Sequence, residues 1–122
     1  MNRELTETEK HLLRWMLEHG MPEARAFLPQ LEQAQATSWR CACGCASFNL
    51  SVEGSPEPSG GMNVVADFIF GTDEDLCAIM VYAIDGILAG VEVYTLTPGS
   101  VADRALPSPE SLRPPKWNNT RA

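Results

Sequence analysis

The sequence predicts an α+β fold, with two N-terminal helices on one face of an antiparallel sheet of about five strands and a proline-rich C-terminal tail. Three patterns indicate this fold. Apolar residues recur at helical spacing near the N-terminus, alternate with polar residues in the middle of the chain, and give way to prolines near the C-terminus. We expect one domain over residues 1–122, with a helical part in 1–35, the sheet in 36–97 and an irregular tail in 98–122.

A capping box at the start of the chain predicts the first helix. Thr6 can accept a hydrogen bond from the backbone N–H of Glu9, while the Glu9 carboxylate reaches back to the N–H of Thr6. Apolar residues then follow at helical spacing as far as Leu17. Gly20 stands where helices often end on a left-handed residue, so we expect a positive φ there.

A second helix is predicted to follow directly. Pro22 suits its first turn, and Pro29 falls in the middle of its apolar stripe, where the helix should kink or restart. The stripe consists of Ala24, Phe27, Leu28, Leu31 and Ala34.

Strands are predicted where apolar and polar residues alternate. Residues 48–52 and 64–70 show this alternation and are separated by a loop rich in Gly, Ser and Pro. Asp85 and Gly86 lie between two further apolar runs and predict a two-residue hairpin turn. That turn predicts four opposed pairs on one buried face: Ile84 with Ile87, Tyr82 with Ala89, Met80 with Val91, and Ala78 with Val93.

The other face of this hairpin is almost as apolar, with Glu92 as the exception. Its predicted pairs are Ala83 with Leu88, Val81 with Gly90, Ile79 with Glu92, and Cys77 with Tyr94. A sheet face open to water is normally more polar, so we expect something to cover it. The candidates are the tail, with Leu106, Leu112 and Trp117, and a second copy of the chain. In the second case the protein is a homodimer, and its interface residues are Ile79, Val81, Leu88 and Tyr94.

The acidic composition limits the classes of partner. A formal net charge of −7 repels phosphate, so we expect neither nucleic acid nor an anionic membrane surface as a partner. No apolar run approaches the roughly 18 residues of a membrane span, and the polar N-terminus shows no apolar export signal. The chain is therefore expected in the cytoplasm, where cysteines remain thiols or bind metals.

The common catalytic motifs are absent from the sequence. It has no G-x-S-x-G elbow, phosphate loop or H-E-x-x-H run, which favours a protein that is not an enzyme. His11 and His19 lie too far apart on the first helix to share a metal and are expected on the surface. Asp67 and Glu92 could meet across the sheet as a carboxylate pair, although outward-facing acids are usually just solvated.

Three of the 4 cysteines, Cys41, Cys43 and Cys45, form a tight cluster. With the remote Cys77 they match the ligand count of a four-thiolate zinc site, although C-x-C-x-C is an atypical spacing for one. The thiols could instead be redox-active, because C-x-C can close a strained disulfide. The cluster could therefore serve a zinc-binding function or a thiol-redox function.

The simplest interpretation of the cluster needs no ligand or cofactor. A two-residue hairpin turn at residues 43–44 would place Trp39 opposite Phe48, with Cys41 beside them in the core. Cys45 would then point to the opposite face of the sheet.

Two stretches resemble a family of small uncharacterised bacterial proteins: residues 39–48 (WRCACGCASF) and 85–94 (DGILAGVEVY), together with the segment 106–110 (LPSPE). Those proteins have a capped N-terminal helix, a C-x-C-G-C segment and a strand that ends in Glu-Val/Ile-Tyr. The resemblance implies a cytoplasmic α+β protein and carries no known activity. Some relatives of this size act as immunity proteins beside toxins, which is an analogy at the level of the fold.

We therefore expect a non-catalytic interaction or ligand-binding protein that forms a homodimer. The alternative is a metal-binding or redox protein that uses the cysteine cluster.

Overall fold

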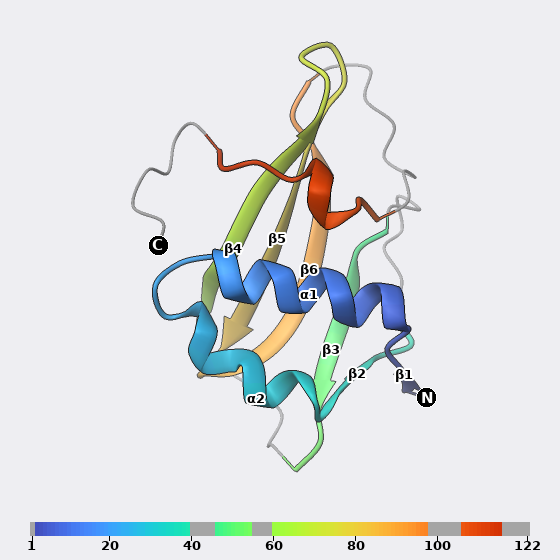
Figure 1. The fold of residues 1–122 in the computed structure, drawn as a ribbon. Coiled ribbons are helices and arrows are strands. Elements are labelled where there is room, and N and C mark those ends of the chain that lie inside the picture. Colours follow the sequence, from blue (N-terminus) through green and yellow to red (C-terminus); the bar gives the residue numbers. More distant parts are fainter. Residues whose placement is uncertain (1, 40–45, 55–59, 98–105, 116–122) are drawn as a thin grey trace.

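Both helices pack on one face of an antiparallel sheet in the computed structural model, which describes residues 2–39, 46–54, 60–97 and 106–115 (Figure 1). In chain order the elements are β1 (Arg3–Glu4), α1 (Glu7–His19), the 3-10 helix η1 (Ala24–Phe27), α2 (Leu28–Leu31), β2 (Ala34–Ala36), β3 (Phe48–Val52), β4 (Met62–Gly71), β5 (Leu76–Ile84), β6 (Ile87–Thr95) and the 3-10 helix η2 (Pro109–Ser111). The 6-stranded sheet has the order β1-β2-β3-β6-β5-β4. The α+β class is confirmed, and the number of strands is corrected from about five to six.

The first helix begins at the predicted capping box. The Thr6 hydroxyl accepts from the Glu9 N–H at 3.1 Å, and the Glu9 carboxylate accepts from the Thr6 N–H at 2.9 Å. The same carboxylate accepts from both terminal nitrogens of the Arg3 guanidinium, each at 2.8 Å. This bidentate ion pair connects β1 to the start of α1. The hydrogen bonds from Arg3 and Thr6 hold the pKa of Glu9 below its usual value.

The end of α1 differs from the prediction. Gly20 has φ −85° and ψ −146°, so it is not left-handed. Glycine is needed there for space, because a Cβ would lie 2.7 Å from the carbonyl oxygen of Val65 and 2.7 Å from the Cβ of Ala66. The helix end therefore lies directly against β4, and the Met21 N–H donates to the Val65 carbonyl at 2.9 Å.

The second helical segment is broken, as predicted. The 3-10 helix ends at Phe27, and α2 starts at Leu28 with Pro29 in its first turn, where a missing N–H does no harm. Ala34 was predicted in the helical stripe but belongs to β2. The strands β1 and β2 are too short, at 2 and 3 residues, to show a period in the sequence, and both were missed.

The hairpin of β5 and β6 forms at the predicted turn. Asp85 and Gly86 have φ values of 55° and 77°, and the first opposed pair is the predicted one. The Gln30 amide of α2 fastens the turn to the helical layer. It donates to the Gly86 carbonyl at 2.8 Å and accepts from the Leu88 N–H at 2.8 Å.

The predicted register holds for two pairs, Ile84–Ile87 and Ala83–Leu88, and is wrong beyond them. Tyr82 pairs with Gly90 and not with Ala89, because Ala89 is an extra residue in a β-bulge. The bulge shifts β6 by one residue, so its later side chains lie on the opposite face from the predicted one. Each residue of β5 before Ala83 therefore pairs with the residue one position further along β6 than predicted. The observed pairs are Val81–Val91, Met80–Glu92, Ile79–Val93, Ala78–Tyr94 and Cys77–Thr95.

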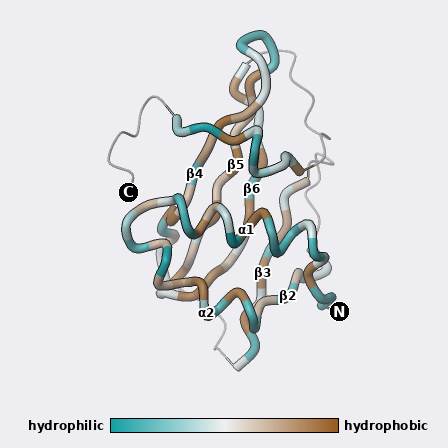
Figure 2. Tube along the Cα trace, viewed as in Figure 1, coloured by the Kyte–Doolittle hydropathy of each residue, from teal (hydrophilic) through white to brown (hydrophobic). Residues whose placement is uncertain are grey.

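The bulge groups the aliphatic residues of the hairpin on the helical side. Val81, Val91, Ile79 and Val93 are at most 5% exposed and belong to one core cluster with the α1 residues Leu12, Leu13, Met16 and Leu17. The prediction that Ala78, Met80 and Tyr82 face this core is therefore wrong. Hydrophobic colour runs along the central strands, whereas α1 alternates between hydrophobic and hydrophilic, as a helix with one buried side should (Figure 2).

The tail crosses the sheet on the same side as α1 (Figure 1). Leu112 is 9% exposed within the core cluster, and Leu106 packs against that cluster. Arg113 forms a bridge with Ile69 at the outer edge of β4, with N–H to carbonyl distances of 2.9 and 3.0 Å. The tail thus covers part of the face that holds Ile79 and Val81, while Trp117 lies outside the described residues.

Candidate functional site

Only Cys77 of the predicted cysteine site lies in the described part of the chain. Cys41, Cys43 and Cys45 are outside it, so the zinc, redox and turn interpretations stay predictions. Cys77 is 1% exposed and packs in the core. Among the described residues, no group of three or more His, Cys, Asp or Glu side chains could hold a metal ion.

Trp39, two residues before Cys41, is not in the core. The hairpin interpretation placed it opposite Phe48, but its side chain is 47% exposed. The ladder of β2 and β3 pairs Ala36 with Leu50, which is one residue out of step with a two-residue turn at 43–44. That part of the prediction is therefore wrong.

The residues predicted to form a homodimer interface are separated by the structure. Ile79, Val81 and Leu88 are at most 1% exposed beneath the helices, so they cannot form a surface between folded copies. Tyr94 lies on the opposite face and is half-buried. The bulge at Ala89 is the cause, because it moves Tyr94 away from the aliphatic residues with which the predicted register grouped it.

The side of the sheet opposite the helices is the candidate site. Within the described part of the chain, both helices and the tail lie on the other side of the sheet (Figure 1). We call the centre of the open side the tyrosine–carboxylate face, which consists of Asn49, Asp67, Met80, Tyr82, Glu92 and Tyr94. Glu92 is exposed, Asp67 is 9% exposed, and the other four are half-buried.

Three of these side chains form one row across the strands. Asp67 of β4 pairs with Met80 of β5, which in turn pairs with Glu92 of β6. Since neighbouring strands lie about 4.7–4.9 Å apart, the two acidic residues are roughly 10 Å apart with the methionine between them. Tyr94 follows Glu92 on the same face of β6, and Tyr82 follows Met80 on the same face of β5.

Tyr82 reaches across β6 to the next strand. Its hydroxyl donates to Oδ1 of Asn49 in β3 at 3.1 Å. A Cβ at Gly90 would collide with the tyrosine hydroxyl and ring, so the glycine leaves the space that the ring occupies. The hydrogen bond fixes the direction of the ring before any partner arrives.

The acidic side chains act on both tyrosines. Burial, followed by the negative charges of Asp67 and Glu92, raises the pKa of the Tyr94 hydroxyl. Burial and then Glu92 raise the pKa of Tyr82. Both phenols therefore stay neutral at physiological pH, and Glu92 is close enough to influence both rings.

The sequence contained part of the signal for this face. Asp67 and Glu92 do share a face, as the sequence analysis considered, but Met80 stands between them. Met80 and Tyr82 were missed because the predicted register assigned them to the core. Glu92, an acid within an otherwise apolar run, was the sign that one side of β6 is open.

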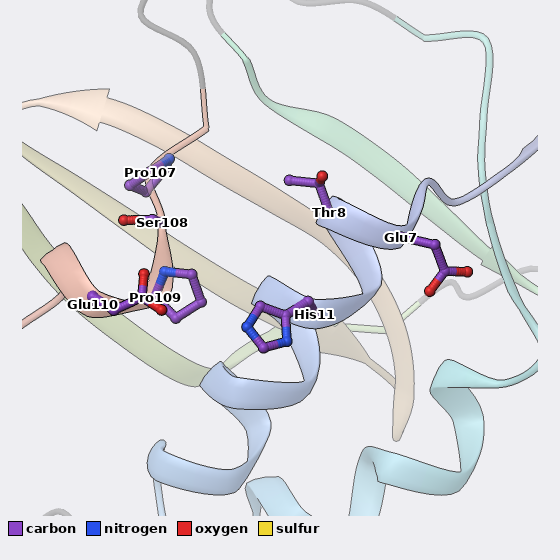
Figure 3. A pocket seen from close by; sticks show the side chains of 7 residues that line it. All are labelled: Glu7, Thr8, His11, Pro107, Ser108, Pro109 and Glu110. Carbon is purple, nitrogen blue, oxygen red and sulfur yellow. The ribbon is translucent and has the colours of Figure 1, made fainter.

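A shallow groove of about 380 Å³ lies between the start of α1 and the tail (Figure 3). Figure 3 shows the ring of His11 between the two segments, with Glu7 and Glu110 at opposite ends. Within the described part of the chain, none of these three side chains has a hydrogen-bond or ion-pair partner, so the groove offers no oriented acid–base pair. Its other lining residues are Thr8, Pro107, Ser108 and Pro109.

The edges of the sheet are poorly suited to the addition of a partner strand. On β4, the carbonyl of Val65 accepts from Met21, Ile69 is bridged to Arg113, and the carbonyl of Gly71 accepts from the Arg113 guanidinium at 2.9 Å. The opposite edge, β1, has 2 residues. Short or occupied edges disfavour the addition of a partner strand.

Comparison of the chain with protein-family models, curated proteins and solved structures finds no match. The resemblance to small bacterial proteins therefore stays a prediction. No helix among the described residues is long and apolar enough to cross a membrane, and α1, the longest of them, has 13 residues.

Proposed function

We propose that this protein is a non-catalytic interaction protein that recognises a protein partner through the tyrosine–carboxylate face. One observation carries the proposal: the residues with the composition of a recognition surface lie together on the side of the sheet that the helices leave open. Tyrosine and methionine are enriched in protein interfaces, and tyrosine gives a large contact area at a low cost in conformational entropy.

The rigidity of the face supports the same function. Ile69 and Ala78, in the row next to Met80, are 6% and 1% exposed, so the floor of the face is packed. The Tyr82 ring is held by Asn49. Side chains that are already held in one direction lose less entropy on binding, which favours recognition by this surface.

The groove beside α1 is the weaker candidate. Its ionisable side chains, Glu7, His11 and Glu110, are not oriented by one another, and the groove is shallow. A partner seated there would bind mainly to prolines and flexible charged side chains, whose ordering costs free energy.

Site-specific photo-crosslinking in living cells tests the proposal. A photoreactive amino acid replaces Met80 on the face in one variant. In matched controls it replaces His11 in the groove or Glu18, on the outer side of α1. We expect adducts from position 80 and none from the two controls, because only position 80 would lie against a partner on the open face.

The mass of the adduct identifies the partner. An adduct of two chains of 13.4 kDa would identify a second copy, and any other mass a different protein. The absence of adducts from position 80, or equal adducts from all three positions, overturns the proposal. Circular dichroism of each variant verifies that the fold is retained.

A further inference from the structure

The tail docks on the edge of the sheet in the manner of a bound peptide. β4 is the outermost strand, and the backbone of Arg113 pairs with that of Ile69 through two N–H to carbonyl hydrogen bonds of 2.9 and 3.0 Å. The Arg113 guanidinium donates to the carbonyl of Gly71 at 2.9 Å. Main-chain pairing with a strand edge, with side chains held in pockets beside it, is a common mode of peptide recognition.

One side of the docking segment, residues 106–115, is buried at a regular interval. Pro109, Leu112 and Pro115 are buried, whereas the four residues between them are exposed. A period of three is typical of 3-10 and polyproline helices, which present every third residue to one side. Leu112 belongs to the core cluster, so the segment presents a narrow apolar stripe to the body of the protein.

The docking segment holds its own turn by local hydrogen bonds. The N–H and the hydroxyl of Ser111 both donate to the carbonyl of Ser108, at 3.1 and 2.7 Å, and the Leu112 N–H donates to the Pro109 carbonyl at 3.1 Å. Pro109 lies in the first turn of η2, where its fixed φ favours a helical start. None of these bonds involves the sheet or α1, so the segment can keep this turn when it leaves the edge. A preorganised segment loses less entropy on docking.

The contact between the docking segment and α1 is loose. The groove of about 380 Å³ separates residues 107–110 from the start of α1 (Figure 3). Glu7 of the helix and Glu110 of the segment both line this groove, and like charges oppose its closure. The attachment is therefore concentrated at the edge of β4 and at the buried stripe, which makes the segment a separable unit.

We propose that the edge of β4 at residues 69–71 and the apolar surface beneath Leu112 form a peptide-docking site. The chain's own docking segment occupies this site, and the docking segment of a second copy can replace it. The inference is independent of the proposed function, which concerns the opposite side of the sheet.

Three properties favour a second copy as the partner. The segment that fits the site is part of the chain itself, and its two charges, Glu110 and Arg113, cancel, so the formal charge of −7 on the chain does not repel it. Residues 96–105 join the segment to β6, and ten residues span up to roughly 33–36 Å when extended. Exchange of an identical segment keeps the contacts of the site, which makes it a low-cost route to a two-fold dimer.

Fluorescence anisotropy with the isolated segment tests the site. The probe is a fluorescein-labelled peptide of residues 106–115 (LPSPESLRPP), added to full-length proteins. Two variants loosen the protein's own segment: Leu112→Ala removes apolar contacts, and Arg113→Pro removes the N–H that donates to Ile69. Both loosened variants should capture the peptide. Wild type should bind it at least about tenfold more weakly, because its tethered segment competes at an effective concentration on the order of millimolar.

Controls assign the binding to the edge of β4. Glu110→Gln changes an exposed residue outside the buried stripe, so this variant should bind the peptide as weakly as wild type does. A peptide with alanine in place of Leu112 should bind the loosened variants at least about tenfold more weakly. Circular dichroism verifies the fold of each variant. If Leu112→Ala does not fold, Arg113→Pro still carries the test, because position 113 is exposed and follows an extended residue, as proline requires.

The oligomeric state tests the second copy. Wild type refolded from urea at about 1 mM, where the segment of a second copy competes with the tethered one, should contain dimers of the 13.4 kDa chain by analytical ultracentrifugation. The loosened variants treated in the same way should stay monomeric, because their segments dock weakly on either copy.

Two sets of results would contradict the inference. If neither loosened variant captures the peptide, or if wild type captures it equally well, the edge of β4 is not a docking site. Capture of the peptide without any dimer of the refolded wild type overturns the second copy as the partner and assigns the edge to a similar segment of another protein. None of these results bears on crosslinking at position 80, which tests the opposite face.

Discussion

Gly20 tests how closely α1 approaches the sheet. Substitution by alanine adds a methyl carbon that would lie 2.7 Å from the Val65 carbonyl oxygen and 2.7 Å from the Ala66 Cβ. Neither neighbour is the movable end of a long side chain, because one is backbone of β4 and the other is attached directly to it. The helix and the strand must therefore move apart to admit the methyl group.

Overpacking of this kind should cost about 2–3 kcal/mol of the free energy of unfolding. For a domain of 122 residues, with an unfolding entropy of about 2.1 cal/mol/K per residue, that cost lowers the Tm by about 10 °C. The cost is steric, because φ at Gly20 is −85° and alanine avoids no left-handed conformation there.

Thermal and urea unfolding of Gly20→Ala and Gly20→Asn distinguish this packing from a left-handed helix end. A left-handed position tolerates asparagine better than alanine. A steric limit gives the opposite order, because asparagine adds more atoms. Gly61→Ala is the control, since a Cβ there meets nothing within 4 Å. A loss below about 0.5 kcal/mol for Gly20→Ala, or a more stable asparagine variant, would refute the reasoning.

Three further predictions concern contacts between the layers. Glu9→Gln should lower the free energy of unfolding at pH 7 by about 1 kcal/mol, because the bidentate ion pair with the half-exposed Arg3 is lost. The folded-state pKa of Glu9 lies below its usual value, so the wild-type advantage is present above the unfolded-state pKa and disappears as the pH falls through the folded-state pKa. An advantage that persists into strong acid would contradict this. Gln30→Ala should cost about 1–3 kcal/mol in urea unfolding through two lost hydrogen bonds, and an unchanged midpoint would show that those bonds contribute nothing. Cys77 should react with a thiol reagent only as the protein unfolds, and rapid native labelling found by peptide mapping would place it at the surface.

Features that depend on neighbours in the chain could be predicted from the sequence. The capping box joins Thr6 to Glu9 within one turn, and the hydrogen bonds form as predicted. Pro29 restarts the second helix because the ring removes one backbone donor. Asp85 and Gly86 adopt positive φ and form the hairpin turn. In each case the cause lies within a few residues of its effect.

Features that depend on distant contacts required the tertiary structure. Gly20 is required because α1 ends close against β4, and not because the helix ends on a left-handed residue. The sequence could not show this, since β4 lies more than forty residues later in the chain. The short strands β1 and β2 exist because each has a neighbour to pair with.

The residues of the tyrosine–carboxylate face can be read in the sequence, but their grouping on one side of the sheet cannot. The turn defines the register only as far as the bulge, which follows the pairs Ile84–Ile87 and Ala83–Leu88. Since the side-chain period of a strand is two, the extra residue Ala89 moves the later residues of β6 to the opposite face from the predicted one. This shift lets the helices cover Ile79 and Val81 and leaves Tyr94 and Glu92 open. The sequence by itself determined the hairpin, whereas packing against a helix from the other end of the chain decided which side of the hairpin is buried in the core.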